Sequence, residues 1–295
     1  RHFAEPPGKP AVVRGGALGW PALERWRMAP LVRRLGSMSF MVDRDYDDDV
    51  VVIARFDDFA AYCQEEASWH RNPLYIFDDV FGDYDSSSPA DGMLDEYEAP
   101  LICRDLLKLI EEEDLRPPHR WLLVGPRRSG SFPHRDPLAT SAWNATICGA
   151  KRWVMMPPDV AKEAVHAAHG PAGAPDTYGW FEDLGAVWQR LTPAQRARSV
   201  DFVAAAGDVV WVPTGWWHAV MNLSSWTVGI TENCVPIFDS GERPRIARGT
   251  WEALAERLED EQLQSIFRAL RGTPDEVLLP ARGPRRLRHE PSYSS

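Results

Sequence analysis

The chain has 295 residues, of which 44% are hydrophobic and 26% charged, and its formal net charge at pH 7 is −10. This length and apolar content suit a large globular fold and exclude wholesale disorder. The acidic balance argues against broad, non-specific binding to nucleic acid, and it suits either a basic peptide or protein as partner or simple solubility.

The four cysteines are widely spaced, and none forms a Cys-x-x-Cys pair: Cys63, Cys103, Cys148 and Cys234. This spacing predicts neither a zinc knuckle nor a disulfide framework, and it favours a reduced, intracellular setting in the nucleus or cytoplasm. No stretch approaches the roughly 20 apolar residues of a membrane span, so no membrane partner is expected. The chain begins at Arg1 rather than Met, which suggests a fragment or processed form, so the absence of a targeting signal carries little weight.

Residues 1–115 are predicted to form α/β elements that pack on the core. Apolar residues at helical spacing predict a helix near 21–35. The acidic run 43–49 lacks the spacing and the distal Glu of an EF-hand, so a solvated hairpin turn is favoured over a Ca²⁺ loop. The other elements predicted in this region are strands at 37–42, 50–56 and 73–77, a helix after Asp57, and a short helix near 104–113.

Residues 116–236 are predicted to form the core, because short strands alternate there with Gly and Pro turns. The strands are expected at 120–125, 141–147, 151–155, 200–204, 208–213, 218–222 and 227–233. Residues 159–199 are helical in pattern and predict an insertion; its His166 and His169 lack acidic or cysteine partners, which favours surface histidines over a metal pair. The pattern predicts a mainly β fold, a double-sheet jelly roll (double-stranded β-helix) with flanking N-terminal and C-terminal α-helices.

Residues 237–295 are predicted to form a C-terminal helical segment and a basic tail. The helix is expected over 250–271, where apolar residues form a stripe. That stripe either packs on its own domain or pairs with a second copy, and the second alternative predicts a homodimer through this helix. For the basic tail, 282–288, a frayed terminus is favoured over a localisation signal or an RNA contact.

Two stretches of the core offer the ligands of a non-haem iron centre. In an extended strand, residues i and i+2 point to the same side, so His134 and Asp136 converge while Arg135 points away. The stretch 207–218 turns into an apolar strand and brings His218 to the start of the next one. Two imidazoles and one carboxylate are the facial triad of Fe(II) sites. The two stretches together favour this interpretation over a histidine packed in the core beside tryptophans.

These stretches also carry a family resemblance. His134-Arg135-Asp136, together with Gly-Asp-Val-Val-Trp-Val-Pro-Thr-Gly-Trp-Trp-His at 207–218, resembles the Jumonji-C (JmjC) domain of Fe(II)- and 2-oxoglutarate-dependent oxygenases. Further segments are similar to the lysyl hydroxylase/arginine demethylase branch once named phosphatidylserine receptor: 73–78, 120–121, 125–126, 128–130, 136–138, 140–144 and 151–153. The resemblance runs from about residue 5 to about residue 236 and implies the cupin/JmjC form of the jelly roll.

The resemblance implies that His134, Asp136 and His218 are catalytic and hold the metal, with Fe(II), 2-oxoglutarate and O₂ as cofactor and co-substrates. It implies that Lys151 pairs with the distal carboxylate of 2-oxoglutarate, for which a lysine supplies charge and hydrogen bonds. The other residues implied for the co-substrate are Tyr75, Ser131, Asn144, Asn222 and Thr231. Those implied for the substrate pocket are Trp121, for which core packing is an equal alternative, and Asn233.

The expected function is hydroxylation of a protein side chain, either at a lysine carbon or at the methyl group of a methylarginine. One alternative is a JmjC-fold binding module with weak or no catalysis. Others are a hydroxylase of another protein residue or of nucleic acid, and a cupin-type isomerase or dioxygenase, which would have no use for Lys151. The partner expected is a basic protein or peptide, and nucleic acid is not expected to bind this fragment.

Overall fold

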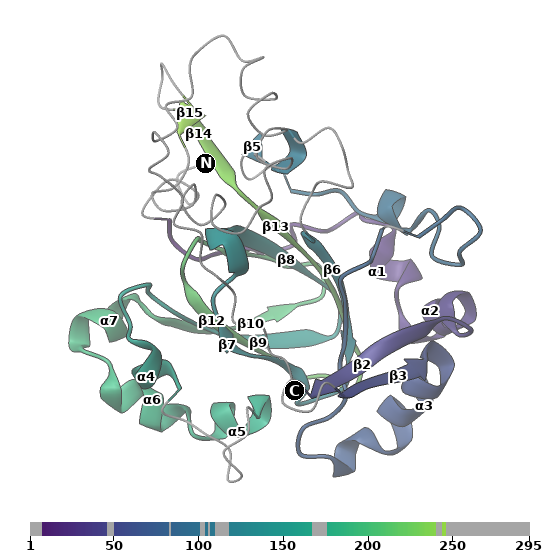
Figure 1. Cartoon of the computed structure of the whole chain (residues 1–295), viewed down its shortest axis with the longest axis horizontal. Helices are drawn as coiled ribbons and strands as arrows, with labels where there is room; N and C mark the ends of the chain where they lie inside the picture. Colours follow the sequence, from purple (N-terminus) through teal and green to yellow (C-terminus); the bar gives the residue numbers. More distant parts are fainter. Residues whose placement is uncertain are drawn as a thin grey trace, which may run out of the picture.

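Two antiparallel sheets face each other at the centre of the molecule (Figure 1). Their strands are β1 (Ala11–Val13), β4 (Ile76–Asp78), β6 (Arg120–Gly125), β7 (Gly130–His134), β8 (Ser141–Cys148), β9 (Ala150–Met156), β10 (Val200–Ala205), β11 (Val209–Val212), β12 (Trp217–Asn222) and β13 (Thr227–Cys234). The larger sheet has the order β1-β11-β8-β13-β6-β4 and the smaller β10-β9-β12-β7. The computed structural model describes residues 8–45, 50–82, 84–100, 104–105, 107–109, 118–166, 176–239 and 244–245.

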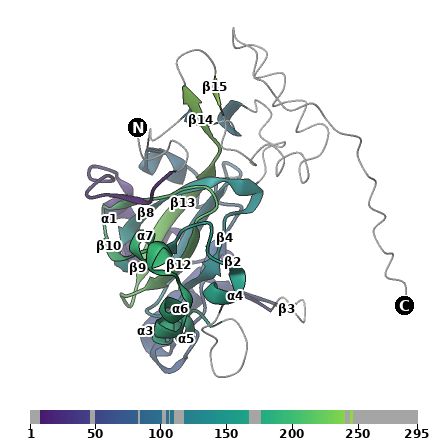
Figure 2. The same ribbon diagram turned by 90° about the vertical axis from the view of Figure 1, so that its left-hand side faces the viewer.

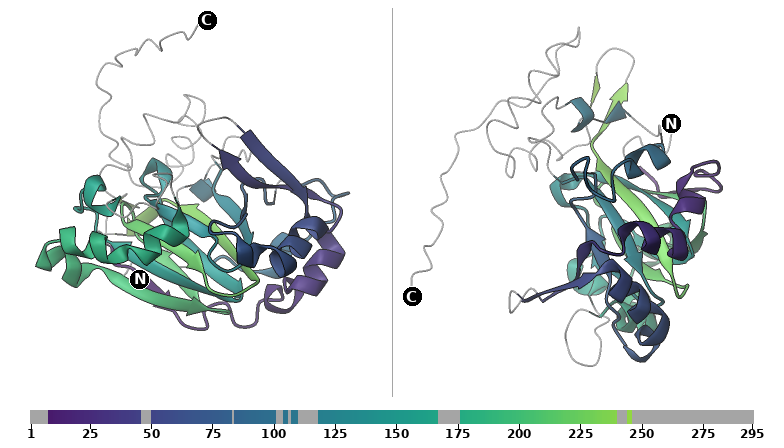
Figure 3. Two further views of the ribbon diagram at one scale, coloured as in Figure 1. Left: turned by 90° about the horizontal axis from the view of Figure 1, so that it is seen from below. Right: turned by 90° about the vertical axis from the view of Figure 1, so that its right-hand side faces the viewer.

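Each sheet buries its outer face under helices, and Figure 3 shows the sheets between the two helical sets. The larger sheet is covered by α1 (Ala22–Arg25), α2 (Met28–Leu35) and α3 (Phe56–Glu65), which share one apolar cluster with it. The smaller sheet is covered by α4 (Lys162–Val165), α5 (Thr177–Glu182) and α6 (Leu184–Arg190), and α7 (Pro193–Arg198) follows them without burying a residue; together they form the segment predicted as a helical insertion. The inner faces are thereby left for a cavity, and the predicted mainly β double-sheet fold is confirmed.

The alternation of strand side chains explains this layering. Val154, Met156, Trp217 and Ala219 point outward from β9 and β12 and pack against the insertion helices around Trp180. Burying a side chain the size of Val154 or Met156 contributes about 1.5–3 kcal/mol, so this packing stabilises the outer face of the smaller sheet.

The remaining elements lie at the margins of the two sheets. The hairpin of β2 (Ser39–Asp45) and β3 (Val50–Arg55) extends away from them (Figure 2). A separate three-stranded sheet joins β5 (Arg104–Asp105), β14 (Pro236–Asp239) and β15 (Pro244–Arg245). Short 3-10 helices occupy Ala67–Trp69, Met93–Glu96, Leu107–Leu109 and Pro137–Ala139.

Two local predictions are wrong. The helix expected near 21–35 is two helices, because a proline at position 30 cannot donate to the carbonyl of Trp26 and its ring clashes with that carbonyl. The helix expected near 104–113 is absent at its start, where Arg104–Asp105 is a strand and Leu107–Leu109 a 3-10 helix. Oδ1 of Asp105 accepts hydrogen bonds from the backbone N–H of Leu107 and Val235, and these contacts override the local helical pattern.

Several predictions lie outside the described residues: the helix at 250–271, the basic tail, the middle of the acidic run at 46–49, and His169. Of the cysteines in the described part of the chain, Cys63 and Cys148 are free thiols. Of the helices that the structure describes, none has the length and apolar character needed to cross a membrane.

Candidate metal centre

A cavity of about 200 Å³ lies between the two sheets. Most of its lining comes in pairs two residues apart, because alternate side chains of a strand face the same side. The pairs are Tyr75/Phe77, Trp121/Leu123, Ala142/Asn144, Lys151/Trp153, His218/Val220 and Thr231/Asn233, and the other lining residues are Ser131, His134, Asp136, Pro137 and Val212. Both sheets therefore contribute polar and aromatic side chains to one cavity.

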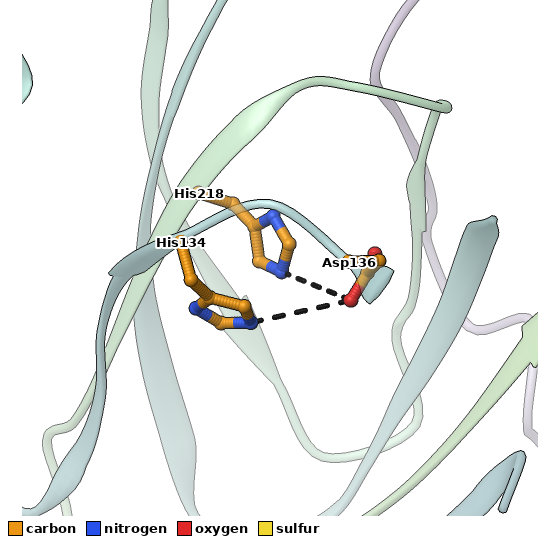
Figure 4. Close-up of side chains that lie close together, drawn as sticks. All are labelled: His134, Asp136 and His218. Carbon is orange, nitrogen blue, oxygen red and sulfur yellow. Dashed lines mark ion pairs between the residues drawn. The ribbon is translucent and has the colours of Figure 1, made fainter. Parts of the chain in front are cut away.

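His134, Asp136 and His218 meet on the wall of this cavity (Figure 4). Nε2 of His134 lies 4.0 Å, and Nε2 of His218 3.7 Å, from Oδ1 of Asp136. One ligand atom from each residue lies within 4.8 Å of the others, and no other such group of three occurs in the described ranges. His134 and His218 are register partners in the β7–β12 ladder, so a single backbone pairing brings both imidazoles together.

Backbone carbonyls fix the orientation of both imidazoles. Nδ1 of His134 lies 2.8 Å from the carbonyl oxygen of Phe132, and Nδ1 of His218 lies 3.2 Å from that of Trp216. A carbonyl only accepts, so each Nδ1 carries the proton and each Nε2 lone pair is directed toward Asp136. The indole of Trp153 stacks on His218, with ring centroids 6.3 Å apart. Both histidines thus present the nitrogen that binds metals.

The electrostatics of the triad also favour a cation. Burial lowers the pKa values of His134 and His218 to about 4 and raises the pKa of Asp136 to about 6. At neutral pH the site therefore holds two neutral imidazoles and one carboxylate. Oδ2 of Asp136 is buried and has no hydrogen-bond partner among the described residues. Side-chain exposure is 42% for His134, 11% for Asp136 and 6% for His218, so solvent reaches the site most easily at His134. A buried carboxylate with one unpaired oxygen beside two nitrogen lone pairs fits a divalent metal.

Lys151 occupies the same cavity farther along β9. Met155 is the register partner of His218 on that strand, so Lys151 lies four residues, roughly 13 Å of strand, from the level of the histidine. Its side chain is only 1% exposed, and in the described part of the chain its ammonium forms no hydrogen bond or ion pair. Burial lowers its pKa to about 7. Gly229 leaves room for it, since a Cβ there would lie 2.9 Å from Nζ.

Sequence comparison agrees with this geometry. A family model described as a cupin-like domain matches residues 2–233. The chain belongs to this cupin-like, JmjC-type family. It is 32% identical over 290 residues to the arginine-specific demethylase JMJ22 of Arabidopsis thaliana, covering 92% of this chain and 52% of the relative.

Two further relatives carry names that state an activity. The chain is 32% identical over 240 residues, 79% of this chain and 57% of the relative, to the bifunctional arginine demethylase and lysyl-hydroxylase psr-1 of Caenorhabditis briggsae. It is 27% identical over 241 residues, 74% of this chain and 53% of the relative, to the mouse 2-oxoglutarate and iron-dependent oxygenase JMJD4. The chain thus spans about half the length of each of these three relatives.

Nearly all the site residues predicted from the sequence line the cupin-like cavity; their individual roles stay predictions. Asn144 is the register partner of Thr231, and its Oδ1 is buried without a hydrogen-bond partner in the described ranges. The Thr231 hydroxyl donates to the Trp143 carbonyl oxygen at 2.8 Å, which leaves oxygen lone pairs for another donor. Burial raises the pKa of Tyr75, so its hydroxyl stays protonated and can donate.

Asn222 is the exception, because it does not line the cavity. Its Nδ2 donates to the Ser129 hydroxyl at 2.9 Å, and that hydroxyl donates to the Pro126 carbonyl oxygen at 2.6 Å. Asn222 therefore braces the turn that leads into β7. His166 is half-buried rather than a free surface histidine, since its ring packs against Phe132 at 5.3 Å and Trp217 at 5.8 Å.

The cavity residues that the sequence analysis missed are mostly apolar: Phe77, Leu123, Pro137, Ala142, Trp153, Val212 and Val220. A usable signal exists for most of them, because they lie two positions from a predicted site residue on the same strand. Val212 has no such neighbour, and only the pairing of β11 with β8 places it beside Ala142.

Proposed function

We propose that this chain is an Fe(II)- and 2-oxoglutarate-dependent oxygenase that oxidises a basic side chain of a protein. One observation carries the proposal: a single cavity contains two histidines and one aspartate arranged for a metal, and a buried lysine without an anionic partner in the described ranges. A binding module, or a cupin enzyme without a dicarboxylate co-substrate, gives no reason for that lysine.

The residues divide the work along the cavity. When bound, iron and 2-oxoglutarate supply the oxidising chemistry, in which the co-substrate becomes succinate and CO₂ and one oxygen atom of O₂ enters the substrate. His134, Asp136 and His218 would hold the metal. The Nδ1 hydrogen bonds of the two histidines keep their imidazoles turned toward it. Lys151 would receive the distal carboxylate, and the walls around both groups exclude water.

The substrate class is supported by the aromatic side of the cavity. Phe77 packs against Trp121 with ring centroids 5.8 Å apart and against Tyr75 at 6.4 Å. Phe77 is also partly exposed, so it lies where a side chain can enter from solvent. Aromatic faces attract lysine and arginine cations, and the net charge of −10 favours a basic polypeptide. The names of the relatives include both arginine demethylase and lysyl hydroxylase, so either cation is a candidate.

The direct test is anaerobic loading with Fe(II) and 2-oxoglutarate, followed by O₂ and lysine- or methylarginine-containing peptides. The expected result is succinate together with a peptide heavier by one oxygen atom, or lighter by one methylene as the hydroxymethyl group leaves as formaldehyde. His134→Ala is expected to abolish both products. Succinate release that persists in that variant would contradict the proposal.

The main alternative is a binding module that keeps the fold without catalysis. Calorimetry separates the two, because the proposed oxygenase binds Mn(II), used in place of Fe(II), and then 2-oxoglutarate. A folded protein that binds neither would support the binding module instead.

A further inference from the structure

Two crossovers between the sheets adjoin the candidate metal ligands. Residues 135–140 lead from β7 in the smaller sheet to β8 in the larger one and carry Asp136. Residues 213–216 lead back from β11 to β12 and end just before His218. The strand β8 lies between β11 and β13, so its first residues lie where both crossovers meet the larger sheet.

Thr140 ties the first crossover to β13. Its hydroxyl donates to the Pro137 carbonyl oxygen at 2.8 Å, and its backbone N–H donates to the same oxygen at 3.1 Å. The same hydroxyl accepts a hydrogen bond from Nδ2 of Asn233 at 3.0 Å. Leu138, inside this turn, has a φ of 54°, a left-handed conformation that costs free energy for a branched side chain and that the surrounding hydrogen bonds hold in place.

Ser141 ties the second crossover to the same place. Its hydroxyl accepts a hydrogen bond from the Thr214 backbone N–H at 3.0 Å, and the Ser141 and Thr214 hydroxyl oxygens are 2.8 Å apart. The turn is closed by the Trp216 N–H, which donates to the Pro213 carbonyl oxygen at 3.2 Å. The Trp216 carbonyl oxygen in turn accepts from Nδ1 of His218. This is one connected path from Ser141 to a candidate metal ligand.

We propose that Thr140 and the hydrogen-bonded pair of Ser141 and Thr214 are positioning residues that hold Asp136 and His218 at the separation a metal requires. The inference rests on the proposed function, because it assumes a metal between these residues. Thr140, Ser141 and Asn233 are all buried, so water does not replace a lost partner readily. Asn233, predicted from the sequence as a substrate residue, also anchors the turn that carries Asp136, because its amide donates to the Thr140 hydroxyl.

The test compares variants that remove or retain each hydroxyl. Thr140→Val removes the hydroxyl at nearly constant volume, and Thr140→Ser retains it. Thr214→Val and Thr214→Ser form the same pair for the second crossover. The matched control is Thr146→Val, since Thr146 is also buried on β8 but its hydroxyl has no hydrogen-bond partner among the described residues. Three quantities are measured for each variant: the Mn(II) affinity by electron paramagnetic resonance, the ligand-field absorption of bound Co(II), and the thermal unfolding temperature of the metal-free protein.

Thr140→Val and Thr214→Val are each expected to weaken Mn(II) binding on the order of tenfold or more, the usual effect of losing a group that orients a ligand. They are also expected to shift the Co(II) spectrum. Both serine variants and Thr146→Val should match the wild type. A valine variant that folds and keeps wild-type affinity and spectrum would overturn the inference, as would a loss equally large in Thr146→Val. Failure of the wild type itself to bind Mn(II) would instead count against the proposed function.

If one valine variant does not fold without metal, the other crossover still decides the question. Each crossover has its own hydroxyl and its own rescue variant, so the two pairs are independent. A purely structural role would lower the unfolding temperature without changing the Co(II) spectrum of the folded fraction, and that result contradicts a positioning role.

Discussion

The two polar regions of the cavity are held in different ways. At the metal end, each histidine is fixed by a backbone carbonyl, and the turn that carries Asp136 is anchored by Thr140. At the other end, Lys151 is more deeply buried than any of the three ligands, yet it has no hydrogen bond or ion pair in the described part of the chain. Burial shifts the pKa values at both ends toward the neutral forms.

This difference indicates how each end is completed. Three ligands that are already oriented lose little freedom when a metal binds, which favours affinity and a defined geometry. A buried, unpaired cation is unfavourable until an anion arrives. The metal end is therefore preorganised by the protein, whereas the lysine end depends on its ligand for half of its ion pair.

The largest effect is expected from Asp136→Asn, which keeps the shape of the side chain and removes the anionic ligand. Metal binding and turnover should fall to the background of metal-free protein. In the metal-free wild type, burial raises the pKa of Asp136 to about 6. Above pH 6, folding of the wild type therefore carries the cost of a desolvated carboxylate, which the variant avoids. The metal-free variant should therefore unfold at the same temperature as the wild type or at a higher one, as measured by calorimetry. A variant that still bound iron at wild-type affinity would show that the metal end is wrongly assigned.

Lys151→Met tests the other end with the next largest effect. Losing one charge-assisted contact of about 1.5–3 kcal/mol should raise the KM for 2-oxoglutarate about 10- to 100-fold, with Mn(II) affinity unchanged. The matched control is Arg152→Met, because Arg152 is the next cation on β9 and pairs with Asp201 at 2.7 Å on the outer face. The contrast between the two ends fails if both variants change KM alike, or if Lys151→Met also removes metal binding.

The pH dependence of co-substrate binding should follow the same lysine. Its pKa is lowered from 10.5 to about 7 in the ligand-free protein, and a carboxylate beside it raises that pKa again. Above pH 7, binding of 2-oxoglutarate should therefore take up a proton, and affinity should fall by up to about tenfold per pH unit. Without the ligand the sign is opposite: the unfolded chain binds the extra proton between pH 7 and 10.5, so the free energy of unfolding rises across this window.

Calorimetry in buffers of different ionisation enthalpy measures the proton uptake directly. With Mn(II) bound, the observed heat of 2-oxoglutarate binding should vary with the buffer in the wild type at pH values above 7. In Lys151→Met the heat should not vary. Equal uptake in both proteins would assign the proton to another group.

Local periodicity predicted the first two ligands of this site, because strand side chains alternate with a fixed period. Convergence of His134 and Asp136 needed only the two-residue spacing, and it also placed Arg135 on the other side. His218 was predicted from the second stretch, 207–218, and Lys151 from the family resemblance, because the alternation within one strand reaches neither of them. Their meeting depends on the pairing of β12 with β7 and β9.

The errors arise where distant contacts decide. Asn222 has the alternation expected of a cavity residue, yet its side chain donates a hydrogen bond to Ser129, 93 positions away, and does not line the cavity. Asp105 sits in a helical pattern, but its contact with Val235 draws the segment into a strand pair. The roles of Thr140 and Ser141 were invisible in the sequence for the same reason, because each depends on a turn or strand at least 73 positions away.

Arg135 provides the smallest expected effect and the sharpest limit on the metal end. It lies between two candidate ligands in the sequence, but its guanidinium donates to the Pro158 carbonyl oxygen at 2.7 Å and lies 4.2 Å from the centre of the Trp217 ring. Arg135→Ala should therefore leave Mn(II) affinity unchanged and lower the free energy of unfolding by only about 0.5–1 kcal/mol, the value of a partly exposed cation–π contact. Denaturant titration of the metal-free protein measures the second quantity. If Mn(II) affinity fell as well, the outer face of β12 would have to be coupled to the ligands through Trp217, the neighbour of His218. The preorganisation of the metal end would then extend beyond the hydrogen bonds of the histidines and of Thr140.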